Sequence, residues 1–197
     1  MSGRPRRSPR PGNILRGIAL IARGRRDGLD QFGDYPQDFL ASLAPLIAFP
    51  LVGGLLMLAG GQPQAAASGF LTALVALLAP PVLSYEPARW WRRQDHWLRY
   101  ATALNWCQWI VPVLGIILLT LVFPLVQSLA SARAAGMVVI GLLVAYGLWL
   151  HWFIARHGLA ISPLRAALLV VLVNLTTAVL VFLPQFATTR HLASLVR

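Results

Sequence analysis

Five long apolar stretches make up most of this chain, and they restrict its fold more than any other feature. None contains Asp, Glu, Lys or Arg, and each is close to the roughly 20 residues that a helix needs to cross hydrocarbon. Lipid offers the backbone no hydrogen-bond partner, so such segments cross it as helices. The sequence therefore predicts an all-α polytopic membrane helical bundle with five transmembrane helices, over residues 39–61, 65–85, 101–126, 137–155 and 166–184.

The composition agrees with a membrane domain that has only short flanks. Of the 197 residues, 57% are hydrophobic and 12% charged, whereas soluble domains carry roughly a quarter charged residues. We expect a 1–38 arm before the spans and a 185–197 tail after them. All 17 basic residues are arginine, which favours a GC-rich bacterial genome, and the single Cys107 excludes an internal disulfide.

The arginines lie on alternate sides of the spans. Eight precede the first span, four follow the second and two follow the fourth, against three in the remaining connections and tail. Positive loops stay cytoplasmic, so we expect an inner (plasma) membrane protein with its N-terminus inside and its C-terminus outside. The net charge of +11 then indicates anionic lipid headgroups and not nucleic acid. No signal peptide is recognisable, so the first span should remain uncleaved.

A short amphipathic helix is expected in the N-terminal arm, after a disordered stretch over residues 1–12. Asn13 is a suitable N-cap for a helix that runs to about Gly24. Arg16 and Arg23 lie opposite an apolar face, which favours a helix in the plane of the interface. A disordered basic arm is the alternative. The apolar face comprises Ile14, Leu15, Ile18, Ile21 and Ala22.

A second interfacial helix is expected over Arg89–Tyr100, because on one helix its tryptophans separate from its arginines. Tryptophan prefers the headgroup level and arginine reaches lipid phosphate there. The residues expected at the lipid interface are Trp90, Trp91, Arg92, Arg93, Trp97 and Arg99. Plain anchoring and a specific lipid or partner site are the two interpretations.

Four acids, Asp27, Asp30, Asp34 and Asp38, lie before the first span on the same predicted side as these arginines. We expect ion pairs between this run and the Arg89–Tyr100 segment, whose Arg89, Arg92 and Arg93 lie on the same side, and we expect Asp38 to cap the first span. The spacing does not match a calcium loop, which leaves a calcium site as a weaker alternative.

Polar residues inside the spans form the remaining candidate site. A polar amide in hydrocarbon needs a hydrogen-bond partner. The structural interpretation is a hydrogen bond between helices, and the functional interpretation is a contact with a substrate or an ion. His151 lies about one turn inside an aromatic and cationic belt and, with Tyr146, is a candidate polar contact. The intramembrane candidates are Asn105, Gln108, His151, Asn174 and Thr177.

Prolines and small residues predict helix irregularities and close contacts. Pro45 and Pro50, followed by Gly53-Gly54, predict a kinked or broken first span, while Pro112 and Pro124 predict kinks in the third. Two small-xxx-small pairs, Gly69 with Ala73 and Gly141 with Ala145, suit close packing of helices.

The overall plan resembles the YIP-type five-span membrane protein family, whose members have a cytoplasmic N-terminal segment before five closely spaced helices. The resembling segments are APLIAFPLVGGLL in the first span and YGLWLHWFIARHGLAISPLRAALL from the fourth to the fifth. The resemblance implies a non-catalytic protein that works through partner contacts or membrane organisation.

The predicted function is accordingly that of a scaffold, membrane-organising or partner-binding subunit, whose specific role the sequence does not indicate. Its partners would be anionic lipid and another membrane protein or a second copy. No catalytic, cofactor or metal motif is recognisable, so no catalytic residue and no cofactor are expected. A small-solute transporter or channel is the alternative, since kinked helices and intramembrane amides suit it. A lipid-modifying enzyme, which would join Asp27–Asp38 with Arg92, Arg93 and His96, is the third.

Overall fold

A computed structural model describes residues 12–195, with side chains described up to residue 182. Its described part is helical, and five stretches are long and apolar enough to cross a membrane. They are α2 (Pro36–Ala59), α3 (Pro63–Trp90), the interrupted stretch Gln94–Leu129, α7 (Ala132–Gly158) and α8 (Pro163–Leu195). The predicted all-α architecture with five spans is therefore confirmed.

The helices extend beyond the predicted span boundaries. α3 continues to Trp90, α7 to Gly158 and α8 to Leu195, so residues 185–195 continue a helix. The predicted bounds followed hydropathy, whereas turns end α2, α3 and α7. The turns contain left-handed residues, with φ of 75° at Gly61, 56° at Arg92 and 50° at Ala160. Residues 1–11, for which disorder was expected, lie outside the described part.

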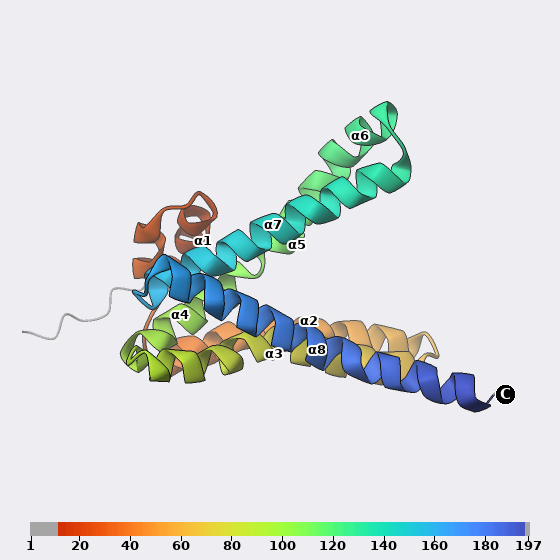
Figure 1. The fold of residues 1–197 in the computed structure, drawn as a ribbon, viewed down its shortest axis with the longest axis horizontal. Coiled ribbons are helices and arrows are strands. Elements are labelled where there is room, and N and C mark those ends of the chain that lie inside the picture. Colours follow the sequence, from red (N-terminus) through yellow and green to blue (C-terminus); the bar gives the residue numbers. More distant parts are fainter. Residues whose placement is uncertain (1–11, 196–197) are drawn as a thin grey trace, which may run out of the picture.

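The helices form two arms that diverge from a shared end (Figure 1). One arm contains α2, α3 and α8. The other contains α5 (Ile110–Ile117), α6 (Phe123–Leu129) and the half of α7 that packs against them. We call the shared end the closed end; it carries the turns at residues 91–93 and 159–162. The turns at residues 60–62 and 130–131 lie at the other, open end.

The buried core lies at the closed end. There α1 (Ile14–Ala22) and the 3-10 helix η1 (Arg26–Gln31) contact α4 (Gln94–Cys107) and α7. Fully buried side chains join these elements and α8, among them Ile21, Tyr100, Ile154 and Leu169. By contrast, most of the apolar part of the third span is exposed, with Gly115 and Leu118 as its buried residues between Ile110 and Leu129. The closed end is thus a packed domain, while the arms expose apolar surface as lipid-facing helices do.

α1 forms where the sequence predicts a helix, and its apolar face packs against protein. The Asn13 carboxamide oxygen accepts from the Arg16 amide at 3.0 Å, as the capping prediction requires. However, Ile14, Ile18 and Ile21 pack against the core. The Tyr146 hydroxyl also donates to the Ala22 carbonyl, at 3.1 Å. Most of the apolar face of α1 therefore contacts protein, and the position of α1 at the lipid interface stays a prediction.

Prolines interrupt the third span and leave the first one continuous. α2 is one helix despite Pro45 and Pro50, so a broken first span is not observed. In the third span α4 ends at Cys107 and α5 begins at Ile110. Pro112 has no amide to bond the Gln108 carbonyl, which instead accepts from Val111 at 3.3 Å. A π-helical segment, η2 (Leu118–Val122), likewise precedes Pro124.

Candidate functional site

The segment Arg89–Tyr100 is not a single interfacial helix. α3 ends at Trp90, residues 91–93 form a turn, and α4 begins at Gln94. Arg92 adopts a φ of 56°, which no continuous helix accommodates. The predicted common face of tryptophans therefore does not exist, because the chain reverses direction within it.

The tryptophans of this segment face different surroundings. Trp90 is exposed, in keeping with an interfacial position. Trp97 instead packs against the core, and its indole nitrogen donates to the Ser84 hydroxyl at 3.2 Å. Trp91 packs there too, with the Arg165 guanidinium over its ring at 5.9 Å. Trp91 and Trp97 thus join helices at the closed end, and lipid contact by Trp90, Arg92 and Arg93 stays a prediction.

One ion pair joins the acidic run to the Arg89–Tyr100 segment, as the sequence predicts, and it uses Arg99. The Asp34 carboxylate lies 2.8 Å from the Arg99 guanidinium. In the described part of the chain, Arg89 pairs with Glu86, and Asp27 pairs with Arg25. Neither Arg92 nor Arg93 forms an ion pair with an acid of the run there. The turn at residues 91–93 ends α3 and starts α4, which carries Arg99 and contacts η1.

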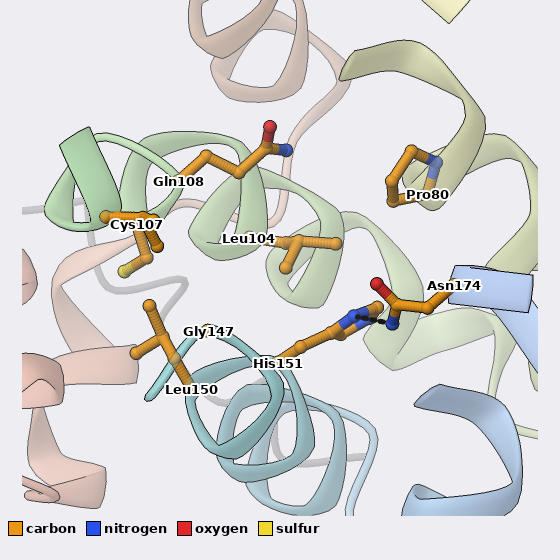
Figure 2. Close-up of a pocket in the computed structure, with 9 residues that line it drawn as sticks. Pro80, Leu104, Cys107, Gln108, Gly147, Leu150, His151 and Asn174 are labelled. Atoms are coloured by element: carbon orange, nitrogen blue, oxygen red, sulfur yellow. Dashed lines mark hydrogen bonds between the residues drawn. The ribbon is translucent and has the colours of Figure 1, made fainter. Parts of the chain in front are cut away.

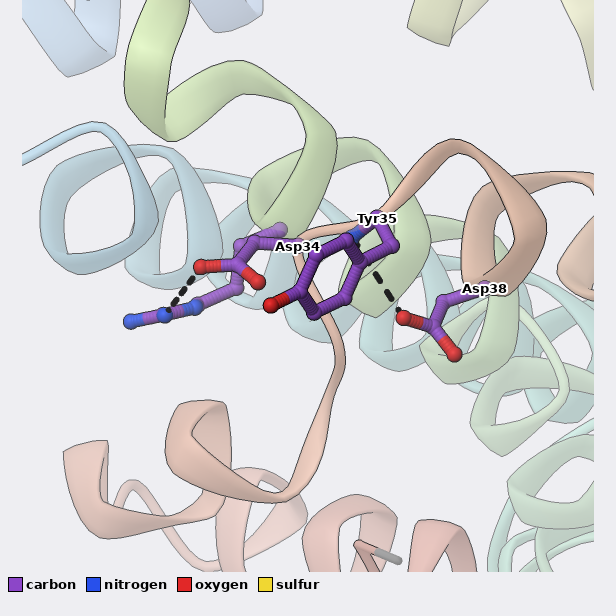
Figure 3. A network of polar contacts seen from close by, with 4 residues as sticks. Asp34, Tyr35 and Asp38 are labelled. Atoms are coloured by element: carbon purple, nitrogen blue, oxygen red, sulfur yellow. Dashed lines mark hydrogen bonds and ion pairs between the residues drawn. The ribbon is translucent and has the colours of Figure 1, made fainter. Parts of the chain in front are cut away.

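Asp38 occupies the position expected of a helix-start residue. Its carboxylate accepts from the Tyr35 amide at 3.4 Å, one turn before it, while Asp34 faces away toward its own partner (Figure 3). This contact supports the first turn of α2, where a negative charge is favoured. The four acids are spread over η1, a loop and α2, so they do not share one helical face.

A cavity lies where the two arms meet, and we call it the junction cavity. Its volume is about 210 Å³. Three predicted intramembrane residues line it together: Gln108 beside the break in the third span, His151 on α7 and Asn174 on α8 (Figure 2). The remaining lining residues are Pro80, Leu104, Cys107, Val111, Gly147 and Leu150. The sequence therefore identified the polar groups of this cavity but could not show that they converge.

A hydrogen-bonded chain crosses one side of the cavity. The Asn174 amide nitrogen donates to the Val170 carbonyl at 2.8 Å and lies 3.2 Å from His151 Nδ1. Since the contact with Val170 fixes the orientation of the amide, Nδ1 accepts. Nε2, 3.0 Å from the Tyr100 hydroxyl, then carries the proton. Both imidazole nitrogens are therefore engaged, and Tyr100, which the sequence did not single out, orients the ring.

Asn105 belongs to a different contact from Gln108. It is fully buried, and its amide nitrogen donates to the Ser42 hydroxyl of α2 at 2.9 Å. This is a hydrogen bond between helices, as the structural interpretation of the intramembrane amides predicts. Ser42 was missed because a lone serine in an apolar span carries no sequence signal of its own. Thr177 lies one turn beyond Asn174, and no described residue accepts from its buried hydroxyl.

Among the described residues, no three His, Cys, Asp or Glu side chains gather closely enough to hold a metal ion. The cavity instead offers neutral amides, one imidazole, one thiol and apolar walls. Such a lining suits recognition by hydrogen bonds and shape.

The chain was compared with known proteins. No family model, curated protein or solved structure matches it. The resemblance to the YIP-type family therefore stays a prediction.

Proposed function

We propose that this chain is a non-catalytic multi-pass protein of a bacterial inner membrane that binds a partner helix within the bilayer. Its N-terminus would be cytoplasmic and its C-terminus outside. The observation that supports this proposal most directly is an exposed surface of small residues on α7. Gly141 and Ala145 are exposed, and a Cβ added at Gly141 would meet no atom within 4 Å.

The helices around this small-residue surface support the proposal. The outer part of the third span, Ile110–Leu129, packs mainly along α7, so this arm is a two-helix layer. Association of helices in lipid depends on close van der Waals packing, and small residues let two backbones approach. Exposed apolar surface alone would be satisfied by lipid. The exposed small residues favour a helix of another protein as the binding partner.

Site-specific photo-crosslinking in cells tests this proposal. We place the photoreactive side chain at Leu148, one helical repeat from Gly141, and at Val82 of α3 as an exposed control. A discrete protein adduct is expected from position 148 only. Gly141→Leu should abolish it, while Gly53→Leu, at an equally open glycine of the other arm, should not. Adducts with lipid alone, or an adduct that survives Gly141→Leu, would refute the proposed surface.

A solute transporter is the second candidate, and the interruption of the third span beside the junction cavity favours it. Transporters often place broken helices at a mid-membrane binding site. Flux into proteoliposomes that is lost in Asn174→Leu and retained in Gln127→Leu would favour transport over partner binding. Absence of flux across a panel of neutral solutes would count against it.

A further inference from the structure

The break in the third span lies beside the junction cavity. At this break the backbone of Gln108 and Trp109 keeps right-handed dihedral angles, but the Trp109 and Val111 amides bond carbonyls three residues back instead of four. α4 and α5 are separated by Gln108 and Trp109, and Gln108 lines the cavity. The interruption therefore presents an amide side chain to this space.

Two hydrogen-bonding groups of the cavity lack a partner within the described part of the chain. The Gln108 amide nitrogen is buried and unpaired. The Asn174 amide nitrogen is used by Val170 and His151, which leaves its carbonyl oxygen as an acceptor. In Figure 2 this oxygen points toward the space between Leu104 and Pro80. An unpaired buried donor is unfavourable, so a ligand that accepts from the Gln108 amide nitrogen would recover part of that cost.

The apolar walls and the size of the cavity restrict the charge and the size of a ligand. Pro80, Leu104, Val111 and Leu150 are apolar, and none of the described residues that line the cavity is Asp, Glu or Arg. A charged head group would lose its hydration without gaining a counterion. A cavity of about 210 Å³ is several times larger than a single water requires. Asn174 is exposed beside it at span depth, so an apolar chain can extend into lipid.

We infer that the junction cavity binds an uncharged amphiphile with a hydroxyl head. The hydroxyl accepts a hydrogen bond from the Gln108 amide nitrogen and donates one to the Asn174 carboxamide oxygen. Its apolar chain lies against Leu104, Val111 and Leu150. A hydroxyl fits better than a carbonyl, because only the hydroxyl both accepts and donates. This inference goes beyond the proposed partner binding and does not depend on it.

The test uses the full chain in nanodiscs and a photoreactive long-chain alcohol as the probe. Labelling is mapped by mass spectrometry, and competitors of equal chain length carry a hydroxyl, a methyl ketone, a carboxylate or no head group. We expect saturable labelling of the peptides that contain residues 104–111 and 147–151. The unlabelled alcohol should compete at least three times more strongly than the other three. Equal competition by the carboxylate or the ketone would overturn the assignment, and this result needs only the unmodified chain.

Matched variants locate the head group. Gln108→Met keeps the side-chain volume but removes the amide, and a net hydrogen bond of about 0.5–1.5 kcal/mol corresponds to roughly two- to twelvefold weaker binding. Gln127→Met makes the same change in the same span, away from the cavity, and should bind as the unmodified chain does. Asn174→Leu should also weaken binding. Undiminished labelling in both Gln108→Met and Asn174→Leu would contradict the inference.

Discussion

Ser42 and Asn105 form the one side-chain hydrogen bond between α2 and α4 in the described part of the chain, and both residues are fully buried. The Asn105 carbonyl oxygen has no partner there. A buried amide that makes a single hydrogen bond fixes the relative position of two helices, although the bond itself contributes little. Measured interhelical bonds in membranes average about 0.6 kcal/mol, with a maximum near 1.7.

A double-mutant cycle on Ser42→Ala and Asn105→Leu should give a coupling energy of about 0.6–1.7 kcal/mol. Ser42→Ala alone should lower the free energy of unfolding by about 1–3 kcal/mol, because it leaves the Asn105 amide unpaired. Unfolding in mixed detergent micelles measures both quantities. Ser68→Ala is the control, since that hydroxyl bonds only carbonyls of its own helix. A coupling energy of zero would show that the two side chains do not interact.

At this scale the sequence predicts which side chains are polar within the spans, but not their partners. Asn105, Gln108, His151 and Asn174 stand out because few polar residues occur in apolar stretches. Tyr100 and Ser42 do not stand out, since tyrosine and serine are ordinary at span ends. Only the fold reveals that the helix break turns Gln108 toward His151 and Asn174 while Asn105 faces α2.

At the scale of elements, Pro112 accounts for the interruption of the third span. Pro112→Ala should restore an amide that can bond the Gln108 carbonyl, and it should join α4 to α5. Hydrogen exchange of the Val111 and Val113 amides should then slow by about tenfold or more, because a proline inside a helix costs about 3 kcal/mol.

Pro63→Ala is the control for that measurement. Pro63 occupies the first position of α3, where the missing amide is not needed, so exchange in α3 should stay nearly unchanged. If exchange at positions 111 and 113 were equally fast in Pro112→Ala, the break would have another cause.

The docking of α1 depends on a close approach at Gly28. A Cβ at this position would lie 2.8 Å from the Gly17 carbonyl oxygen and 3.0 Å from the Ile21 amide nitrogen. Backbone atoms cannot rotate away, so Gly28→Ala should separate η1 from α1 at a cost of about 1–3 kcal/mol. Trypsin should then cleave faster after Arg23, Arg25 and Arg26. Gly53→Ala, with open space around it, should leave cleavage unchanged, and equal rates in both variants would refute this role.

The sequence predicts helical elements better than their ends or their breaks. Asn13 and Asp38 mark two helix starts correctly. The turn at residues 91–93 was missed, because Trp91, Arg92 and Arg93 all allow helix and Arg92 alone adopts a left-handed conformation. Proline alone does not predict a break either, since Pro45 and Pro50 are accommodated in α2 while Pro112 is not.

At the scale of the molecule, the packed core at the closed end and the divergent arms at the open end give the protein a polarity along the spans (Figure 1). α1 lies at the closed end, and α8 ends at the opposite one. Hydropathy alone predicts five crossings but not this shape, because lipid-facing and protein-facing residues are equally apolar here. The divergence depends on the break in the third span and on the closed-end core, which are both tertiary features.

The most direct test of this account is the accessibility of single cysteines to a membrane-impermeant maleimide in intact cells. In a Cys107→Ala background, cysteines replace Arg92 and Ala160 in the closed-end turns, and Gly61 and Ala130 in the open-end turns. We expect positions 61 and 130 to react from outside, and positions 92 and 160 only after permeabilisation. Reaction of positions 61 and 92 from the same side would contradict both the five-span arrangement and the orientation proposed for it.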